Sequence, residues 1–226
     1  MNSSTFYPLG PAHYSSHAFG LERITPPSKR VGVFFATREG HTERIAERIA
    51  ADLRILGFDV DLLPVGHPLP FSLSNYSAAV LAASVHGGSH EKEMVRFVND
   101  HRKELEGMTT AFLSVTLSEA GAEMGDKTPA QHAEFVQDVD RMLGKFFNET
   151  KWLPTRSKPV AGALLYTHYN FLLRLIMRQI AKKAGASTDT SRDYVYTDWV
   201  GLDKFVDDLA EEIRRSPAAA VQAARS

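Results

Sequence analysis

The sequence of 226 residues contains no cysteine. The chain therefore has no disulfide, no thiolate metal ligand and no cysteine nucleophile. No apolar run approaches the roughly 20 residues that a membrane-spanning helix needs, so we expect any membrane contact to be peripheral. The net charge is only −1, and we expect no nucleic acid among the partners.

Common nucleotide and hydrolase signatures are missing as well. Neither Gly-x-Gly-x-x-Gly nor the Gly-Lys-Ser/Thr ending of a Walker loop occurs in the chain. We recognise no Ser/His/Asp arrangement, and we assign no general base. His86 and His90 stand four residues apart, but a metal site there is the less favoured interpretation, so we predict none.

Acidic residues are missing from one long stretch, residues 150–188, which carries seven lysines and arginines. With the whole chain at −1, the remaining residues carry −8. Residues 170–184 within the stretch have helical propensity. Their apolar face comprises Leu172, Leu173, Ile176, Met177 and Ile180, and their basic stripe comprises Arg174, Arg178 and Lys182. Such a helix suits an anionic membrane surface or an anionic, apolar substrate. A helix packed on the domain, with solvated cations, is an equally weighted alternative.

The composition that is present suits one α/β domain. Hydrophobic residues make up 43% of the chain and charged residues 23%, and we expect the domain to span residues 30–215. Residues 1–29 contain four prolines and no strong periodicity. We expect a disordered extension there rather than an organelle presequence, because Arg23 is its first arginine. Residues 216–226 are expected to form a flexible tail.

Hydrophobic patterning predicts five buried strands, at residues 31–35, 58–65, 78–84, 110–116 and 158–165. Further helices are predicted at residues 43–56, 91–106, 129–150 and 200–215, with an acidic loop at residues 117–127. This order predicts a flavodoxin-like, doubly wound parallel sheet with strand order 2-1-3-4-5 and an insert at residues 166–192. Ligands bind such sheets at the carboxyl ends of the strands.

The turn after the first strand is the strongest candidate site. It comprises Thr37, Arg38, Glu39, Gly40, His41 and Thr42. Free N–H groups and the positive dipole end of the following helix favour an anion there. The spacing resembles the phosphate loop of flavodoxins, Thr/Ser-x-Thr-Gly-x-Thr, which cradles the monophosphate of FMN. Glu39 departs from that pattern, with Arg38 as a compensating charge. An ordinary turn with Thr42 as the N-cap is the alternative.

Two further loops leave carboxyl ends of predicted strands beside this turn. The second loop comprises Ser84, Val85, His86, Gly87 and Gly88, and the third comprises Ser114, Val115, Thr116 and Leu117. Adjacent glycines allow backbone to approach a flat ring closely, although a simple tight turn is also compatible with them. We therefore expect the two loops to enclose the isoalloxazine ring of FMN.

The chain as a whole resembles the flavodoxin-type, quinone-dependent protoporphyrinogen dehydrogenases over about residues 30–214. The motifs that carry the resemblance are Thr-Arg-Glu-Gly-x-Thr at 37–42, Ala-Ser-Val-His-Gly at 83–87, Phe-Leu-Ser-Val-Thr-Leu at 112–117, Thr-Pro at 128–129, Trp-x-Pro at 152–154, Ala-Gly-Ala-Leu at 161–164, the insert helix, Thr-Asp-Thr-Ser-Arg at 188–192 and Val-Tyr-Thr-Asp-Trp at 195–199. Plain flavodoxins lack the insert and this ending. Glu119, Glu123 and Asp126 depart from the basic third loop of the family.

The resemblance implies FMN-dependent oxidation of protoporphyrinogen IX, with a membrane quinone as acceptor, in haem biosynthesis. It implies an anionic membrane surface as a peripheral partner, and it leaves a homo-oligomer open. The expected location is the cytoplasmic face of the inner membrane in a bacterium, or the mitochondrial membrane in a eukaryote. A flavodoxin-type electron carrier and an NAD(P)H:quinone reductase are the alternatives.

Overall fold

A computed structural model describes residues 29–67, 72–168, 174, 177–179, 181–182 and 186–216. Its strands and α-helices, in chain order, are β1 (Arg30–Ala36), α1 (His41–Ile55), β2 (Asp59–Pro64), β3 (Ala78–His86), β4 (Ser89–His90), α2 (Lys92–Asp100), α3 (Arg102–Glu106), β5 (Thr109–Thr116), α4 (Leu117–Glu123), α5 (Pro129–Thr150), β6 (Arg156–Ala161), β7 (Ala163–Leu164), β8 (Tyr194–Val195) and α7 (Trp199–Arg215). Short 3-10 turns occur at Leu73–Asn75 and Tyr166–His168. The predicted extension at residues 1–29 and the predicted tail at residues 216–226 lie outside the described residues, apart from Lys29 and Ser216.

The central sheet contains five parallel strands in the order β2-β1-β3-β5-β6. Counted along the chain, this is the order 2-1-3-4-5, so the predicted fold class is confirmed. Val31 of β1 lies opposite Val60 of β2 on one side and Ala78 of β3 on the other. β1 is therefore an inner strand, and its carboxyl end lies at the point where the chain order reverses.

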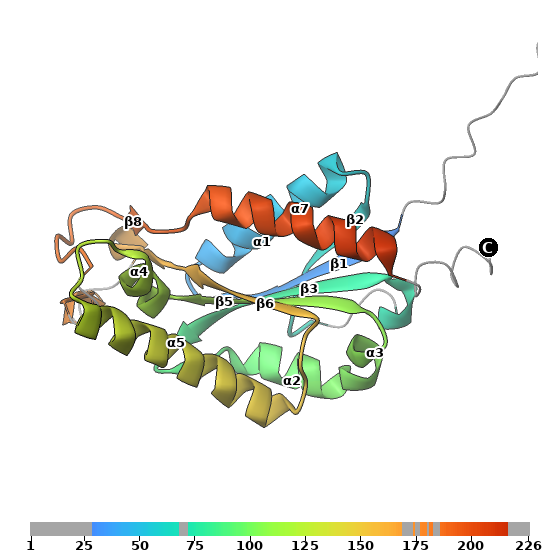
Figure 1. Ribbon diagram of the computed structural model, residues 1–226, viewed down its shortest axis with the longest axis horizontal. Coiled ribbons are helices and arrows are strands. Elements are labelled where there is room, and N and C mark those ends of the chain that lie inside the picture. The colour runs from blue at the N-terminus through green and yellow to red at the C-terminus, as the bar shows by residue number, and fades with distance from the viewer. Residues whose placement is uncertain are drawn as a thin grey trace, which may run out of the picture.

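Both faces of the sheet are covered, and the pleat of β1 shows why its apolar residues run without a break. Val31, Val33 and Phe35 pack into a core with α1 and α7, whereas Phe34 and Ala36 pack on the opposite face. Because successive side chains of a strand point to opposite faces, a strand buried on both sides needs apolar residues at every position. Figure 1 shows α1 and α7 on one side of the sheet and α2, α3 and α5 on the other.

Three predicted elements differ in the structure. The prediction of a single helix at 91–106 is wrong, because the backbone of His101, with φ −114°, leaves the helical conformation and separates α2 from α3. The predicted loop at 117–127 is wrong in its first half, because Thr116 caps α4 by accepting a hydrogen bond from the Ser118 N–H at 3.2 Å. The predicted fifth strand, at residues 158–165, corresponds to β6 and ends at Ala161. Its neighbour β5 ends at Thr116 and has no further residues with which β6 could pair.

The chain after β6 builds a small second sheet instead. The Gly162 N–H donates to the Thr116 carbonyl at 3.0 Å, and β7 then pairs with β8 in antiparallel register. Leu164 and Tyr194 lie opposite each other in that register. This pairing brings the end of the predicted insert beside the carboxyl end of the main sheet.

Candidate functional site

The turn between β1 and α1 has the backbone of an anion site. Gly40, the N-cap residue, adopts φ 84°, a left-handed conformation that glycine reaches without strain. Its N–H donates to Thr37 Oγ1 at 3.0 Å, which closes the turn ahead of the helix. α1 begins at His41, so Gly40 takes the N-cap position that the alternative interpretation gave to Thr42. The first N–H groups of a helix have no partner inside it and attract an anion.

Residues of all three predicted loops line one cavity of about 60 Å³. Those predicted from the sequence are Thr37, Glu39, His41, Thr42, Ser84, Val85, His86, Val115, Thr116 and Leu117. Arg38, Gly40, Gly87, Gly88 and Ser114 do not line it. The structure thus brings together segments about 75 residues apart in the chain at the carboxyl ends of β1, β3 and β5. Their binding roles stay a prediction.

A larger hollow of about 740 Å³ lies elsewhere, along α2. Its lining includes Glu93, Arg96, Asp100 and His101, and it contains no residue of the three loops. Size alone does not identify a site. The smaller cavity is the better candidate because it lies at the strand ends and adjoins a helix N-terminus.

Three buried polar atoms on residues that line the smaller cavity have no hydrogen-bond partner among the described residues. Besides His86 Nε2, they are Thr42 Oγ1, on a residue that is 1% exposed, and His41 Nδ1, on a residue that is 6% exposed. Buried polar groups are normally paired, so unpaired ones beside a cavity indicate a missing ligand. A hydroxyl and a helix N-terminus suit the monophosphate of a flavin nucleotide.

The first and second loops are joined through the buried carboxylate of Glu91. Arg38 Nε lies 3.0 Å from Glu91 Oε1, and Ser84 Oγ donates to the same oxygen at 3.2 Å. Arg38 therefore pairs with Glu91, and its role as a compensating charge in the first loop stays a prediction. Glu39 instead lies 3.1 Å from His86 Nε2, in an electrostatic contact without hydrogen-bond geometry. Arg38 is thereby drawn toward the second loop.

The second loop is a β-hairpin between β3 and β4. His86 lies opposite Ser89 and Val85 lies opposite His90, so the two histidines point to opposite faces. His90 Nε2 is 2.8 Å from Ser114 Oγ, and burial lowers the pKa of His90 to about 4. Within the described residues, no cluster of three or more His, Asp and Glu side chains could hold a metal ion.

Replacing Gly87 with leucine is expected to disturb a bound ring. Gly87 and Gly88 turn the hairpin with φ 58° and 75°, and a Cβ on Gly87 would meet no atom within 4 Å. The leucine side chain would therefore project freely, while the backbone would be strained. We expect a shift of about 30 mV or more in the flavin midpoint potential, or a shifted spectrum, with phosphate binding retained. Gly87→Asn, which tolerates positive φ, is the control. An unchanged spectrum and potential in Gly87→Leu would place the ring elsewhere.

The two hydroxyl side chains of the third loop, those of Ser114 and Thr116, are engaged in hydrogen bonds within the protein. Ser114 is fully buried, and its hydroxyl pairs with His90 rather than facing the cavity. Thr116 uses its hydroxyl to cap α4. Glu119 on α4 lies near Glu123 and Lys158, and burial, reinforced by Glu123, raises the pKa of Glu119 to about 7. Backbone groups of the third loop are therefore better candidates for ligand contacts than its side chains.

Four residues line the cavity that were not among the predicted cofactor-binding residues: Gly162, Ala163, Leu165 and Met177. Met177 belongs to the insert, where an apolar helix face was visible in the sequence without its direction. The other three follow β6, in the segment that was predicted to continue as a strand. Pairing of β7 with β8, which no local pattern signals, turns them toward the cavity.

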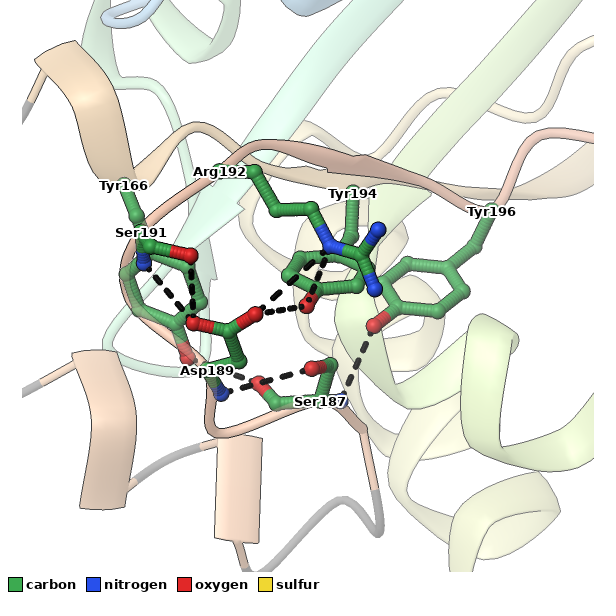
Figure 2. Close-up of polar contacts among 7 residues, drawn as sticks. All are labelled: Tyr166, Ser187, Asp189, Ser191, Arg192, Tyr194 and Tyr196. Atoms are coloured by element: carbon green, nitrogen blue, oxygen red, sulfur yellow. Dashed lines mark hydrogen bonds and ion pairs between the residues drawn. The ribbon is translucent and has the colours of Figure 1, made fainter.

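Hydrogen bonds hold the end of the insert against β8 (Figure 2). Tyr194 Oη donates to Asp189 Oδ2 at 3.0 Å, and Arg192 Nε donates to Tyr194 Oη at 2.9 Å. Tyr196 Oη accepts from the Ser187 N–H at 3.0 Å, and Tyr166 Oη donates to the Ser187 carbonyl at 2.9 Å. Tyr194 and Tyr196 stack with ring centroids 6.4 Å apart. These contacts fix the C-terminal end of the insert beside the cavity.

The three residues of the predicted basic stripe differ in their exposure and contacts. Arg174 is half-buried and donates from Nε to the Tyr166 carbonyl at 3.1 Å, so it helps to hold the insert. Arg178 and Lys182 are exposed. Residues 174, 177–179, 181 and 182 are helical, as predicted. The predicted apolar residues Leu172, Leu173, Ile176 and Ile180 lie outside the described residues.

Comparisons with known proteins identify the family of the chain. A family model described as the flavodoxin domain matches residues 32–191. The protoporphyrinogen IX dehydrogenase (quinone) of Escherichia coli K12 is 32% identical over 178 residues, which cover 79% of this chain and 93% of that protein. The enzyme of the same name from Leishmania major is 31% identical, over 79% of this chain and 73% of that protein.

A solved flavodoxin from the domain Archaea aligns with 82% of this chain and 99% of its own, at 12% identity and a TM-score of 0.42. The family resemblance found in the motifs is confirmed by the named relatives. The chain therefore belongs to the flavodoxin-domain family, as an oxidoreductase with a flavin cofactor whose named relatives are the quinone-dependent protoporphyrinogen IX dehydrogenases.

Proposed function

We propose that this protein binds FMN and oxidises protoporphyrinogen IX to protoporphyrin IX, with a quinone as electron acceptor, as a step of haem biosynthesis. The relatives that carry this activity in their names support the substrate and the acceptor. The observation that carries the cofactor assignment is the unpaired, buried Thr42 hydroxyl beside an open helix N-terminus. FMN would supply the redox chemistry, since a flavin accepts the two electrons of each oxidation.

The residues of the chain would bind the flavin and orient it. Backbone N–H groups of residues 38–42 and the Thr42 hydroxyl would hold the phosphate, and the hairpin at 84–88 with residues 114–117 would enclose the ring. Glu91 ties the first of these loops to the second through Arg38 and Ser84. Apolar side chains of Leu165 and Met177 line the same cavity and would exclude water from the ring.

The direct test is to release and identify the cofactor of the purified protein, then to measure protoporphyrinogen oxidation with and without an added quinone. We expect FMN and a rate that depends on the quinone. An NADH- or NADPH-dependent quinone reduction without porphyrinogen oxidation would favour the NAD(P)H:quinone reductase. Electron transfer to a redox protein without either activity would favour the carrier.

To reduce a quinone that is dissolved in a bilayer, the protein has to bind at the surface of that bilayer. We propose that the exposed cations Arg178 and Lys182 bring the protein to this surface. The proposed location is the surface of the membrane that holds the quinone. Among the described residues, no helix is both long and apolar enough to cross a membrane.

Reversing both charges, Arg178→Glu with Lys182→Glu, is expected to weaken binding to vesicles of anionic lipid by about two orders of magnitude. Each cation near such a surface contributes about 1 kcal/mol, and a reversal converts attraction to repulsion. Sedimentation with vesicles measures the binding. Lys92→Glu with Lys103→Glu changes the net charge equally on α2 and α3 and is the control. If the insert variant instead raised only the KM for porphyrinogen, the cations would pair with the substrate carboxylates.

A further inference from the structure

His41 makes a hydrogen bond that defines which of its ring nitrogens carries a proton. Its Nε2 lies 2.8 Å from Thr197 Oγ1, and that hydroxyl in turn lies 2.7 Å from the Ala161 carbonyl oxygen. A carbonyl oxygen only accepts, so the hydroxyl proton of Thr197 points at Ala161. Thr197 Oγ1 must then accept from His41, which requires the proton on Nε2.

The other nitrogen, Nδ1, is consequently a bare acceptor. Burial, reinforced by the positive charge of Arg44, lowers the pKa of His41 to about 4, so the ring is neutral near pH 7. His41 is 6% exposed, and Nδ1 has no hydrogen-bond partner among the described residues. An unpaired acceptor in such a place costs free energy unless a ligand supplies a donor. His41 also lines the cavity at the start of α1.

Because Nδ1 of His41 can only accept a hydrogen bond, the part of the ligand that contacts it must be a hydrogen-bond donor. A phosphate dianion has no proton to donate, so Nδ1 cannot help to hold it. The ribityl chain of a flavin joins the phosphate to the ring and carries hydroxyl groups, which donate. His41 belongs to the predicted phosphate loop and lines the same cavity as residues of both loops predicted to enclose the ring, so it borders the space through which that chain would pass.

We propose that His41 Nδ1 accepts a hydrogen bond from a ribityl hydroxyl of the flavin, and that Thr197 is the positioning residue that holds His41 in the tautomer able to do so. This inference rests on the proposed cofactor. It gives a role to the Tyr-Thr-Asp-Trp run at 196–199. Besides Thr197, Asp198 caps α7 by accepting from the Gly201 N–H at 3.0 Å, and the Trp199 ring meets His41 edge-on at 6.3 Å.

Three flavins separate the parts of the cofactor: FMN, riboflavin without the phosphate, and lumiflavin without the ribityl chain and the phosphate. Dissociation constants are measured by quenching of flavin fluorescence on flavin-free protein. Thr197→Val keeps the shape of the side chain but removes the hydroxyl. We expect it to weaken the binding of FMN and of riboflavin by the same factor, about fivefold, and to leave the binding of lumiflavin unchanged, since one hydrogen bond is worth about 1 kcal/mol. His41→Phe should match it, and Thr197→Ser should restore wild-type binding within about twofold.

Other patterns would overturn the inference. Weaker binding of FMN alone would mean that His41 contacts the phosphate. An equal loss for all three flavins, or no loss, would leave Thr197 with a structural role. Thermal unfolding of the flavin-free variants checks that the fold is intact. A wild-type protein that binds none of the three flavins would instead refute the proposed cofactor, so the two failures are distinguishable.

Discussion

Gly40→Val is expected to weaken FMN binding by at least about a hundredfold. Gly40 sits at φ 84°, where a residue with a Cβ is strained by about 1–2 kcal/mol and a β-branched one by more. Relief of that strain would turn the N–H groups at the start of α1 away from the phosphate, and charge-assisted hydrogen bonds are worth about 1.5–3 kcal/mol each. Titration of the flavin-free protein with FMN measures the effect. Adding Thr42→Ala should leave no detectable flavin.

Gly57 offers a matched control at the other end of α1. It adopts φ 89°, and, as at Gly40, a Cβ there would meet no atom within 4 Å. Gly57→Val therefore introduces the same backbone strain without touching the loop. It should lower the stability of the protein by a similar amount and leave the affinity for FMN unchanged. Equal loss of FMN in both variants would mean that the effect of Gly40 is one of general stability.

Trp152→Ala is expected to lower the free energy of unfolding by about 3–5 kcal/mol. Trp152 is 0% exposed, and its ring lies edge-on to Phe112, which stacks on Phe146 at 4.3 Å between ring centroids. The alanine would leave a cavity under the face of the sheet that α5 covers. Urea unfolding of the flavin-free protein measures the loss as a lower midpoint with an unchanged slope.

The neighbouring Leu153 is the control, because it is 75% exposed. Leu153→Ala should change the free energy of unfolding by less than about 0.5 kcal/mol. A Trp152→Ala variant as stable as Leu153→Ala would contradict the packing described around Phe112. The comparison matters for function because the same aromatic cluster includes His90, whose ring lies 5.2 Å from that of Phe112 and pairs with Ser114 in the third loop.

Features set by near neighbours in the chain could be predicted from the sequence. The continuous burial of β1 follows from its own six apolar or small residues, and the turn at 37–42 follows from the spacing of Gly40 and Thr42. The carboxyl ends of parallel strands meet at one edge, so the sheet order brought the three loops together without further information.

Features that depend on distant partners could not be predicted. The pairing of Ala163 with Val195 depends on β5 ending at Thr116, and this pairing turns Leu165 toward the cavity. Glu91 stands next to the second loop in the sequence, yet its link to Arg38 exists only once both strands are in place. The tautomer of His41 requires Thr197 and Ala161, each more than a hundred residues away. The break between α2 and α3 at His101 contains no glycine or proline from which it could have been predicted.

The central claim is that the bound flavin takes electrons from protoporphyrinogen IX and passes them to a quinone. The most direct measurement mixes the FMN-loaded protein with protoporphyrinogen IX under anaerobic conditions and follows the flavin absorbance near its visible maximum. The account predicts that the flavin bleaches as porphyrin fluorescence appears, and that an added quinone restores the colour. A flavin that stays oxidised with protoporphyrinogen IX, but bleaches with NADH or NADPH, would contradict it.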